Sequence, residues 1–228
     1  MDQPAVQSRF GRGETTRREI LEASVDIASA EGLEGLTIGR LATELRMSKS
    51  GLFAHFGSKE DLQIATLETA SRIFVTEVVE PTAAVEHGLT RLVAFLDAWI
   101  DSVANTRNRG GCFFYAVSAE MDDRPGKVSD FIAQLTREWI DALTREMKLA
   151  IRLAELKKSC DAELLVFQLH GFVQEGNWFR RLQKNGRAFE MTKESVYRAL
   201  DLQATSTGKA ILADARRKKR NRSSIRVP

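Results

Sequence analysis

The side chains with the clearest capacity for chemistry lie close together, between residues 37 and 59. Thr37, Ser48 and Ser58 each stand directly before a short apolar-patterned segment, where a hydroxyl caps a helix and backbone N–H groups remain free. Free N–H groups at a helix start attract phosphate, and Lys49 and Lys59 add positive charge nearby. These residue types at this spacing favour binding of a phosphate backbone over bond-making chemistry.

Sequence signatures of catalysis are missing. The chain holds no Gly-x-x-x-x-Gly-Lys phosphate loop, no His-Glu-x-x-His zinc motif, no Gly-x-Ser-x-Gly elbow and no Cys-x-x-Cys pair. Cys112 and Cys160 are the only cysteines, too few for a disulfide framework and without metal-ligand spacing. The acidic group of Glu120, Asp122 and Asp123 is typical of an ordinary helix end. We therefore predict no catalytic residue, no cofactor and no metal.

The elements that must position these side chains are helices. Apolar residues recur at helical spacing along most of the chain, and only 4 prolines and 15 glycines interrupt it. We predict an all-α fold with helices at about 15–31, 38–45, 49–56, 58–81, 83–105, 111–122, 126–156, 161–184 and 193–206. Gly32 and Gly57 are expected to end the first and third helices, and Asp161 and Thr192 to cap the last two.

Residues 38–56 have the pattern of two short helices joined by a tight turn at Arg46-Met47. Leu52 and Phe56, four residues apart, would pack the second helix inward. Its other face then carries small and polar side chains, and Gly51 removes bulk where the backbone would approach a base. In a helix-turn-helix the second helix presents such a face to the major groove. The pattern predicts sequence-specific binding to double-stranded DNA.

The run from Leu36 to Leu62, with its capped turn and its His55-Phe56-x-Ser58-Lys59 segment, resembles the DNA-binding domain of TetR-family transcriptional regulators. The resemblance covers about residues 15–62 and is much weaker beyond them, around residues 110–113. It implies an N-terminal three-helix helix-turn-helix domain, a C-terminal helical bundle for ligand binding and dimerisation, and an Ω-shaped homodimer. Such a dimer binds a palindromic operator as a repressor and leaves it when a small apolar or amphipathic effector binds.

Transferred residue by residue, the resemblance assigns contacts within residues 37–59. Thr37, Ser48, His55 and Lys59 match phosphate-contacting positions, whereas Lys49, Ser50, Gly51 and Ala54 match positions that face base edges. Two positions depart from the family pattern. Phe53 replaces a common tyrosine, and Arg46 stands in the turn, where we expect it to add a contact to the DNA backbone. The predicted DNA-binding residues are Thr37, Arg46, Ser48, Lys49, Ser50, Gly51, Phe53, Ala54, His55 and Lys59.

The helix predicted at 161–184 is apolar on more than one side and must therefore be covered on more than one side. A partner subunit and an internal core are the two expected coverings. The predicted dimer-interface residues are Leu165, Leu169, Phe172, Trp178, Phe179, Val196 and Leu200. An effector pocket needs apolar walls and a few polar groups. The predicted ligand-binding residues are Phe95, Trp99, Phe114, Trp139, Phe167, His170 and Gln174.

The net charge of +3 is concentrated at the ends of the chain, and without residues 214–228 the chain would be net acidic. The basic residues near the C-terminus are Arg216, Arg217, Lys218, Lys219, Arg220, Arg222 and Arg226. We predict a flexible basic arm over 1–13, a DNA-binding domain over 14–62, a ligand-binding and dimerisation domain over 63–207 and a disordered basic tail over 208–228. The tail either adds affinity for DNA or only improves solubility.

No segment approaches the roughly 18 continuous apolar residues of a membrane span, and no signal-peptide pattern opens the chain. We therefore expect a cytoplasmic protein without membrane contact, whose partners are operator DNA, a second copy and a small-molecule effector. Two alternatives stay open. Residues 83–206 could act as a small-molecule-binding helical enzyme or carrier, or Cys112 could serve a thiol-sensing regulator.

Overall fold

The structure is a computed structural model that describes the backbone of residues 5–224 and the side chains of residues 13–219. Within this part the chain is helical, and the only strand-like pairing is an isolated bridge between Leu156 and Ala204. The prediction of an all-α fold is confirmed. The α-helices are α1 (Ala5–Gly35), α2 (Ile38–Leu45), α3 (Lys49–Phe53), α4 (Lys59–Phe74), α5 (Leu89–Asn105), α6 (Phe113–Met121), α7 (Lys127–Arg152), α8 (Ala162–Arg181), α9 (Ala188–Gln203) and α10 (Ser206–Ser224).

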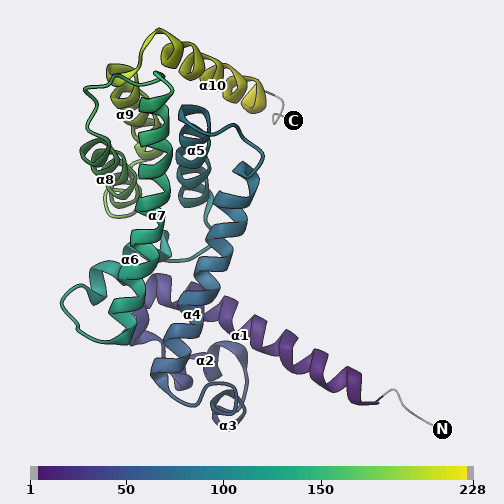
Figure 1. The fold of residues 1–228 in the computed structure, drawn as a ribbon. Helices are drawn as coiled ribbons and strands as arrows, with labels where there is room; N and C mark the ends of the chain where they lie inside the picture. Colours follow the sequence, from purple (N-terminus) through teal and green to yellow (C-terminus); the bar gives the residue numbers. More distant parts are fainter. Residues whose placement is uncertain (1–4, 225–228) are drawn as a thin grey trace. The chain divides into compact units, whose positions relative to one another are not determined.

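Two compact units make up the chain, and each combines separate segments of it. The first unit joins the chain up to Phe74 with Thr106–Leu135, and so contains α1–α4, α6 and the beginning of α7 (Figure 1). The second unit joins Val75–Asn105 with the chain from Thr136 onward, and so contains α5, the rest of α7 and α8–α10. These units differ from the predicted functional domains because α4 and α6 pack against α1.

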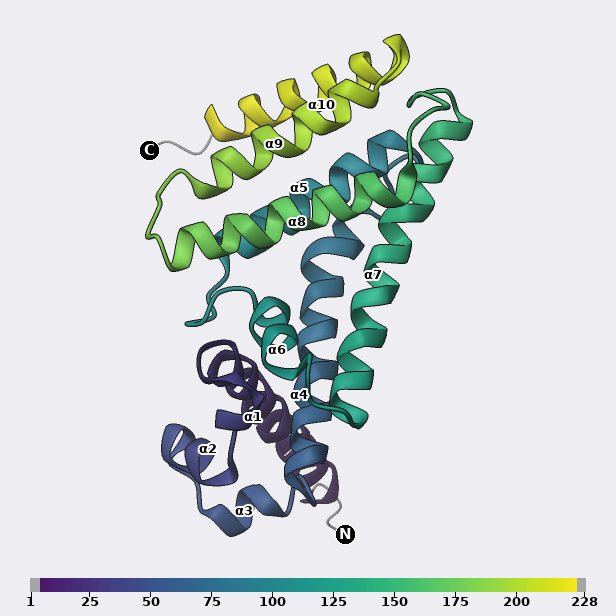
Figure 2. The same ribbon diagram turned by 90° about the vertical axis from the view of Figure 1, so that its left-hand side faces the viewer.

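In the first unit, α1 is the helix against which α2, α4 and α6 pack (Figure 2). Its residues Ile20 and Ile27 are fully buried, together with Leu41 of α2 and Leu52 of α3. Burying one such side chain stabilises the fold by about 1.5–3 kcal/mol. Helices as short as α2 and α3 are unstable alone, so this shared core is what holds them in place.

In the second unit, α5, α8 and α9 surround a common core. Helices α8 and α9 approach each other closely at Gly176 and Thr192, where a Cβ atom on the glycine would overlap the threonine hydroxyl. Thr192 is buried and donates its hydroxyl to the Ala188 carbonyl oxygen at 3.0 Å. The prediction that Thr192 caps this helix is therefore wrong, because the helix already begins at Ala188.

The N-terminal end is helical where a flexible arm was expected. Helix α1 extends back to Ala5, so the expectation is wrong for residues 5–13, while residues 1–4 lie outside the described part. No proline interrupts residues 5–31, and Gly11 and Gly13 each cost a helix only about 1 kcal/mol. As predicted, the continuous helix stops at Gly32, whose φ of 76° is accessible to glycine at little cost.

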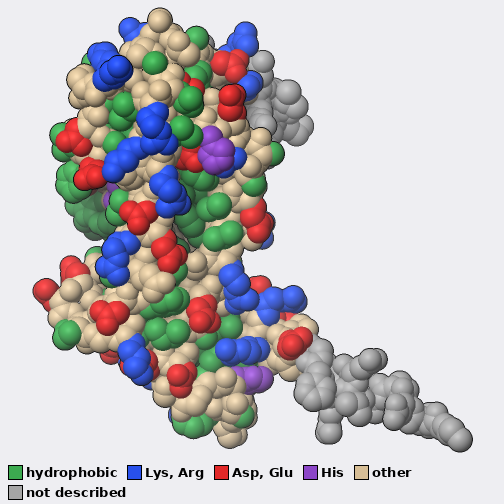
Figure 3. Space-filling model, viewed as in Figure 1, with side chains coloured by type: hydrophobic (Ala, Val, Ile, Leu, Met, Phe, Trp, Pro, Cys, Tyr) green, Lys and Arg blue, Asp and Glu red, His purple; other side chains and the backbone are tan. Residues whose placement is uncertain are grey.

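The C-terminal end is also helical, so the expected disordered tail is wrong for residues 208–224, and residues 225–228 are not described. Leu212 of α10 is fully buried. The Arg216 guanidinium lies 4.8 Å from the centroid of the Tyr197 ring, and the Lys219 ammonium lies 2.6 Å from the Asp97 carboxylate. Acidic partners on α5 and α9 thus neutralise part of the basic run. On the face drawn in Figure 3, basic and acidic side chains are interspersed.

Several helix boundaries differ from the predicted ones, and α3 and α4 are two examples. The α-helical geometry of α4 ends at Phe74, and the chain continues through a π-helical turn at Val75–Val79 and a 3-10 turn at Glu80–Thr82. Helix α3 ends at Phe53, earlier than the predicted residue 56. Among the described residues, no helix combines the length and the apolarity needed to cross a membrane.

Candidate nucleic-acid interface

The turn between α2 and α3 is built by two capping hydroxyls. The Thr37 hydroxyl accepts a hydrogen bond from the Arg40 N–H at 3.1 Å, and the Ser48 hydroxyl accepts one from the Gly51 N–H at 3.1 Å. Between them Arg46 adopts a left-handed backbone conformation, with φ 54° and ψ 38°, which costs a non-glycine residue roughly 1–2 kcal/mol. The predicted tight turn at Arg46-Met47 is therefore present, and the surrounding contacts offset the cost of this backbone conformation.

Helix α3 has one buried and one exposed face. Leu52 and Phe56 are buried in the core of the first unit, as their spacing predicted. Lys49, Ser50 and Ala54 are exposed. Phe53 is 56% exposed, an unusual environment for a phenylalanine, and it joins this outer face. The outward face is therefore small, polar and aromatic, the composition that base edges and thymine methyl groups accept.

The ten predicted DNA-binding residues lie in the first unit, on α3, at the start of α4 and in the turns that flank α2 and α3. Gly51 and His55 are half-buried, and the other eight are exposed. The His55 ring lies 6.2 Å from the Phe56 ring, tilted by 50°. Their assignment to phosphates or to bases remains a prediction.

Lys59 has a partner that the sequence did not reveal. Its ammonium group donates to the Glu34 carboxylate at 2.9 Å and to the Glu34 carbonyl oxygen at 3.1 Å. This hydrogen bond lowers the pKa of the Glu34 carboxyl, and the positive charge of Arg124 lowers it further. Of the three N–H donors on the lysine, two are thus occupied within the chain. Twenty-five residues separate the two side chains, and no local pattern signals the contact.

Glu120 was also overlooked as a positioning residue. Its carboxylate accepts hydrogen bonds from the backbone N–H groups of Leu33 at 2.6 Å and Glu34 at 2.9 Å. The Gln63 side-chain amide donates to the Leu33 carbonyl oxygen at 2.8 Å from the other side. Side chains of α4 and α6 therefore hold the turn that leads into α2. Glu120 therefore has a structural role, and no group of three or more metal-ligating side chains occurs in the described part of the chain.

Four of the predicted ligand-binding residues form an aromatic cluster in the second unit. The Trp139 ring lies 5.5 Å from the rings of both Phe95 and Trp99, and the His170 ring lies 5.2 Å from Trp99. Burial lowers the pKa of His170, which favours the neutral imidazole. Gln174 follows one turn later on α8 and is half-buried.

Two other predicted ligand-binding residues do not join this cluster. Phe114 belongs to the first unit, where its ring meets that of Phe74 edge-on at 6.0 Å. Phe167 is 76% exposed, so it lines no interior space in the subunit. The structure therefore does not place these two residues with the other four, because helical spacing alone does not tell which side of a helix its neighbours will cover.

The predicted dimer-interface residues divide into two groups. Leu165, Leu169, Val196 and Leu200 are buried inside the second unit, which leaves them little surface for a partner. Phe172, Trp178 and Phe179 are half-buried. The large apolar side chains that α8, α9 and the turn between them expose are different ones, which the sequence analysis did not select for the interface: Leu164, Phe167, Leu182, Met191 and Leu202.

Cys112 stands at the start of α6, where burial raises the pKa of its thiol and so disfavours the reactive thiolate. Cys160 is buried, and burial also raises the pKa of its thiol. Neither cysteine has the low thiol pKa that favours a thiolate-based sensor.

Comparison with known proteins adds two family matches. Residues 20–66 match the model described as bacterial regulatory proteins, tetR family, and residues 88–196 match the model described as tetracyclin repressor-like, C-terminal domain. Over 72 residues the chain is 39% identical to the HTH-type transcriptional repressor AcnR of Corynebacterium glutamicum. That alignment covers 31% of this chain and only 37% of AcnR.

Solved structures share the fold over most of the chain. A TetR transcriptional regulator from Chloroflexus aurantiacus superposes with a TM-score of 0.77 at 20% identity, covering 85% of this chain and 98% of that one. AibR, solved in complex with isovaleryl coenzyme A and operator DNA, gives a TM-score of 0.64 at 22% identity and covers 78% of this chain and 94% of its own. At 20–22% sequence identity, the similarity to these structures shows a shared fold and nothing more.

Proposed function

This chain belongs to the TetR family of bacterial regulatory proteins, and on that premise we propose that it is a transcriptional repressor that a small effector releases from a palindromic operator. The observation that carries the proposal is the capped α2–α3 turn. It buries Leu52 and Phe56 and turns Lys49, Ser50 and Ala54 outward. A second helix held in this way can enter the major groove. We propose that the protein acts in the cytoplasm, without catalysis.

Within this proposal, the exposed face of α3 reads the bases. A lysine at the start of such a helix donates to guanine O6 and N7, and small side chains let the helix approach the base edges closely. Thr37, Ser48, His55 and Lys59 are proposed to contact phosphates, which set the position of the helix without carrying sequence information. Phe53, exposed on the same face, suits the methyl group of a thymine.

We propose that a second copy covers the exposed apolar side chains of α8 and α9. Leu164, Phe167, Leu182 and Met191 would otherwise leave a large apolar surface in water. Two copies related by a two-fold axis bury the same patch on each subunit and form a four-helix contact. A dimer also supplies two recognition helices for the two halves of a palindromic site.

The effector is proposed to be a small apolar or amphipathic molecule bound near the aromatic cluster of Phe95, Trp99, Trp139 and His170. Aromatic walls with a single neutral imidazole suit such a ligand. AibR was solved in complex with isovaleryl coenzyme A and operator DNA. An effector acts only through its unequal affinity for the two states, so operator DNA must weaken effector binding by the factor by which the effector weakens operator binding.

Selection of duplexes from a random pool by the purified full-length protein tests the proposal. We expect enrichment of an inverted repeat. The Lys49→Ala variant should then lose about 1–3 kcal/mol of discrimination at one base pair of each half-site, while its affinity for random DNA changes little. Lys193→Gln, a substitution in the second unit, is the matched control. Equal affinity for every duplex would exclude a sequence-specific regulator and favour an enzyme or carrier.

A further inference from the structure

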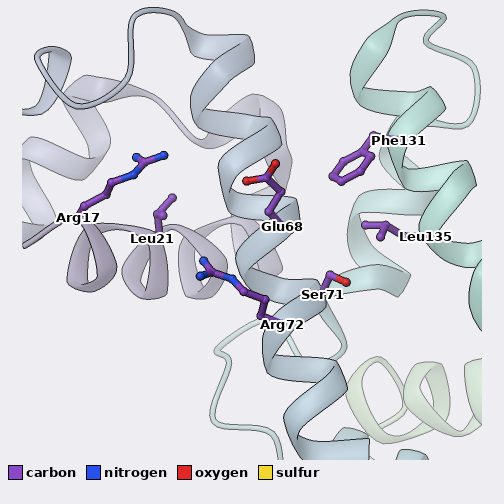
Figure 4. A pocket seen from close by; sticks show the side chains of 7 residues that line it. All are labelled: Arg17, Leu21, Glu68, Ser71, Arg72, Phe131 and Leu135. Carbon is purple, nitrogen blue, oxygen red and sulfur yellow. The ribbon is translucent and has the colours of Figure 1, made fainter. Parts of the chain in front are cut away.

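A pocket of about 450 Å³ lies within the first unit, lined by α1, α4 and the beginning of α7 (Figure 4). Its polar side chains are Arg17, Glu68, Ser71 and Arg72. Figure 4 shows the two guanidinium groups and the Glu68 carboxylate pointing into the same space. The volume is within the range of small-molecule sites, roughly 300–1,000 Å³. With two arginines against one glutamate, the lining is net positive.

Arg17 is the group that most needs a ligand. Its Nη1 atom is buried and has no hydrogen-bond partner among the described residues. A buried donor without an acceptor costs about 1–3 kcal/mol. Arg17 also forms no ion pair with Glu68 in the described structure, although both line the pocket. An oxygen of a bound anion would satisfy this donor.

Arg72 is the second cation of the pocket. Its Nη2 atom donates to the Thr69 hydroxyl at 2.8 Å, which holds one edge of the guanidinium. An arginine guanidinium carries five N–H donors in a planar fork that matches a carboxylate or a phosphate. Four of the donors of Arg72 are therefore left for a ligand or for water.

The remaining wall of the pocket is apolar. Leu21 of α1 is buried in the core of the first unit, while Phe131 and Leu135 of α7 are half-buried beside the pocket. Cationic groups next to apolar side chains match a ligand with an anionic head and a short hydrocarbon body. A fully hydrated inorganic anion would leave the exposed parts of Phe131 and Leu135 in contact with water.

We propose that this pocket binds a small amphipathic anion, with Arg17 and Arg72 on its carboxylate or phosphate group and Leu21, Phe131 and Leu135 against its hydrocarbon part. The site lies in the unit that carries α3, and it is additional to the aromatic cluster of the second unit. Its regulatory consequence rests on the proposed repressor function.

Arg17 connects the pocket to the recognition helix. Its Cζ atom lies 4.8 Å from the centroid of the Phe56 ring, within the range of a cation–π contact. Phe56 lies three residues after the end of α3 and is one of the two buried side chains that anchor it. An anion that draws the guanidinium away from this ring changes the packing behind α3. Occupation of the pocket therefore lowers operator affinity.

Calorimetric titration of the full-length protein, without DNA, tests the site directly. Sodium octanoate should bind, whereas octan-1-ol and octylamine should bind at least about tenfold more weakly, since each lacks the charge that the arginines pair with. Octyl phosphate, titrated in parallel, decides whether the pocket prefers a carboxylate or a phosphate head.

Substitutions with opposite expected effects make the assignment sharp. Arg72→Gln should weaken octanoate binding by about tenfold, the loss of one charged hydrogen-bond partner. Glu68→Gln should strengthen it by about threefold, because it removes a like charge from the pocket. Arg18→Gln is the matched control on α1, since Arg18 is exposed, does not line the pocket and is expected to leave binding unchanged.

The proposed site would be overturned if octanoate failed to bind at millimolar concentration. It would also be overturned if octanoate bound Arg72→Gln, Glu68→Gln and the wild type equally. Operator affinity measured with and without saturating octanoate tests the regulatory part, and equal affinities would overturn it. Because the titrations contain no DNA, their failure leaves the proposed repressor function intact. A failure to select any operator would conversely leave the anion site standing.

Discussion

The ammonium group of Lys59, at the start of α4, lies 2.9 Å from the carboxylate of Glu34, close to the end of α1. Both side chains are exposed, so this ion pair contributes little to stability. Its importance is positional, because it places a predicted phosphate-binding lysine beside an internal anion. A DNA phosphate must compete with Glu34 for the same ammonium group.

Glu34→Gln should raise the affinity for every DNA duplex by about two- to fivefold, since the substitution removes this competing charge. Lys59→Gln should lower the affinity for all duplexes alike and reduce the slope of affinity against salt concentration by about one unit. Fluorescence anisotropy with operator and random duplexes at several salt concentrations measures both effects.

The control for this pair is Lys193→Gln, which breaks the ion pair between Lys193 and Asp101 in the second unit, 2.6 Å apart. It should leave both the affinity and the salt slope unchanged. If Lys59→Gln instead discriminates between operator and random DNA, the lysine contacts bases and its assignment to phosphate is wrong.

Glu120→Gln should destabilise the first unit, because an amide replaces the carboxylate that accepts from the N–H groups of Leu33 and Glu34. Hydrogen bonds to charged groups contribute about 1.5–3 kcal/mol, so we expect a loss of that order in the free energy of unfolding in urea. Asp122→Asn is the control, since its carboxylate is exposed and accepts only from its neighbour's N–H. Similar losses for both variants would contradict the specific role of Glu120.

Phe167→Asp should convert the protein to a monomer, because it places a charge among the apolar side chains that we propose a second copy covers. Sedimentation at micromolar concentration measures the result. Phe53→Asp makes the same change at an exposed phenylalanine of the first unit and should leave the oligomeric state unaltered. A wild-type protein that sediments as a monomer would refute the proposed dimer.

Tyr197 makes the second unit sensitive to alkali. Burial first, and then the charge of Asp97, raise the pKa of its phenol far above the ordinary value of about 10. A pKa raised on folding gives stability that is present below pH 10 and is lost as the pH rises, because only the unfolded tyrosine ionises there. Thermal unfolding from pH 8 to pH 11 should show this decline.

Tyr197→Phe should reduce that decline, while lowering stability at pH 8 through loss of the 2.9 Å hydrogen bond that the phenol donates to Asp97. Tyr115→Phe, a substitution in the first unit that leaves the hydrogen bond between Tyr197 and Asp97 in place, provides the comparison. An identical pH profile for Tyr197→Phe and the wild type would contradict the linkage.

The local features of the interface were predictable from sequence because short-range contacts build them. Thr37 and Ser48 cap helices with N–H groups three residues away, and Asp161 caps α8 in the same way. Leu52 and Phe56 are four residues apart and so share one face of a turn. Hydroxyl caps and helical spacing act within a few residues, and for this reason the all-α fold and the α2–α3 turn follow from the sequence.

The long-range contacts of the chain were not predictable in the same way. Glu120 reaches Leu33 across 87 positions of sequence, and the pocket joins Arg17 to Phe131 from helices far apart in the chain. The C-terminal helix illustrates the same limit, since its basic residues find acidic partners on α5 and α9. Charge composition alone indicated a disordered tail.

The sequence by itself therefore determined the all-α fold, the caps of α2, α3 and α8, which side chains surround the α2–α3 turn and which family the chain resembles. Only the tertiary structure decided which side of α8 is covered, burying Leu165 and Leu169 while exposing Leu164 and Phe167. A helix that is apolar on several sides has no defined outer face in its own sequence. Its outer face is the side that neighbouring helices leave uncovered, and their packing depends on long-range contacts throughout the unit.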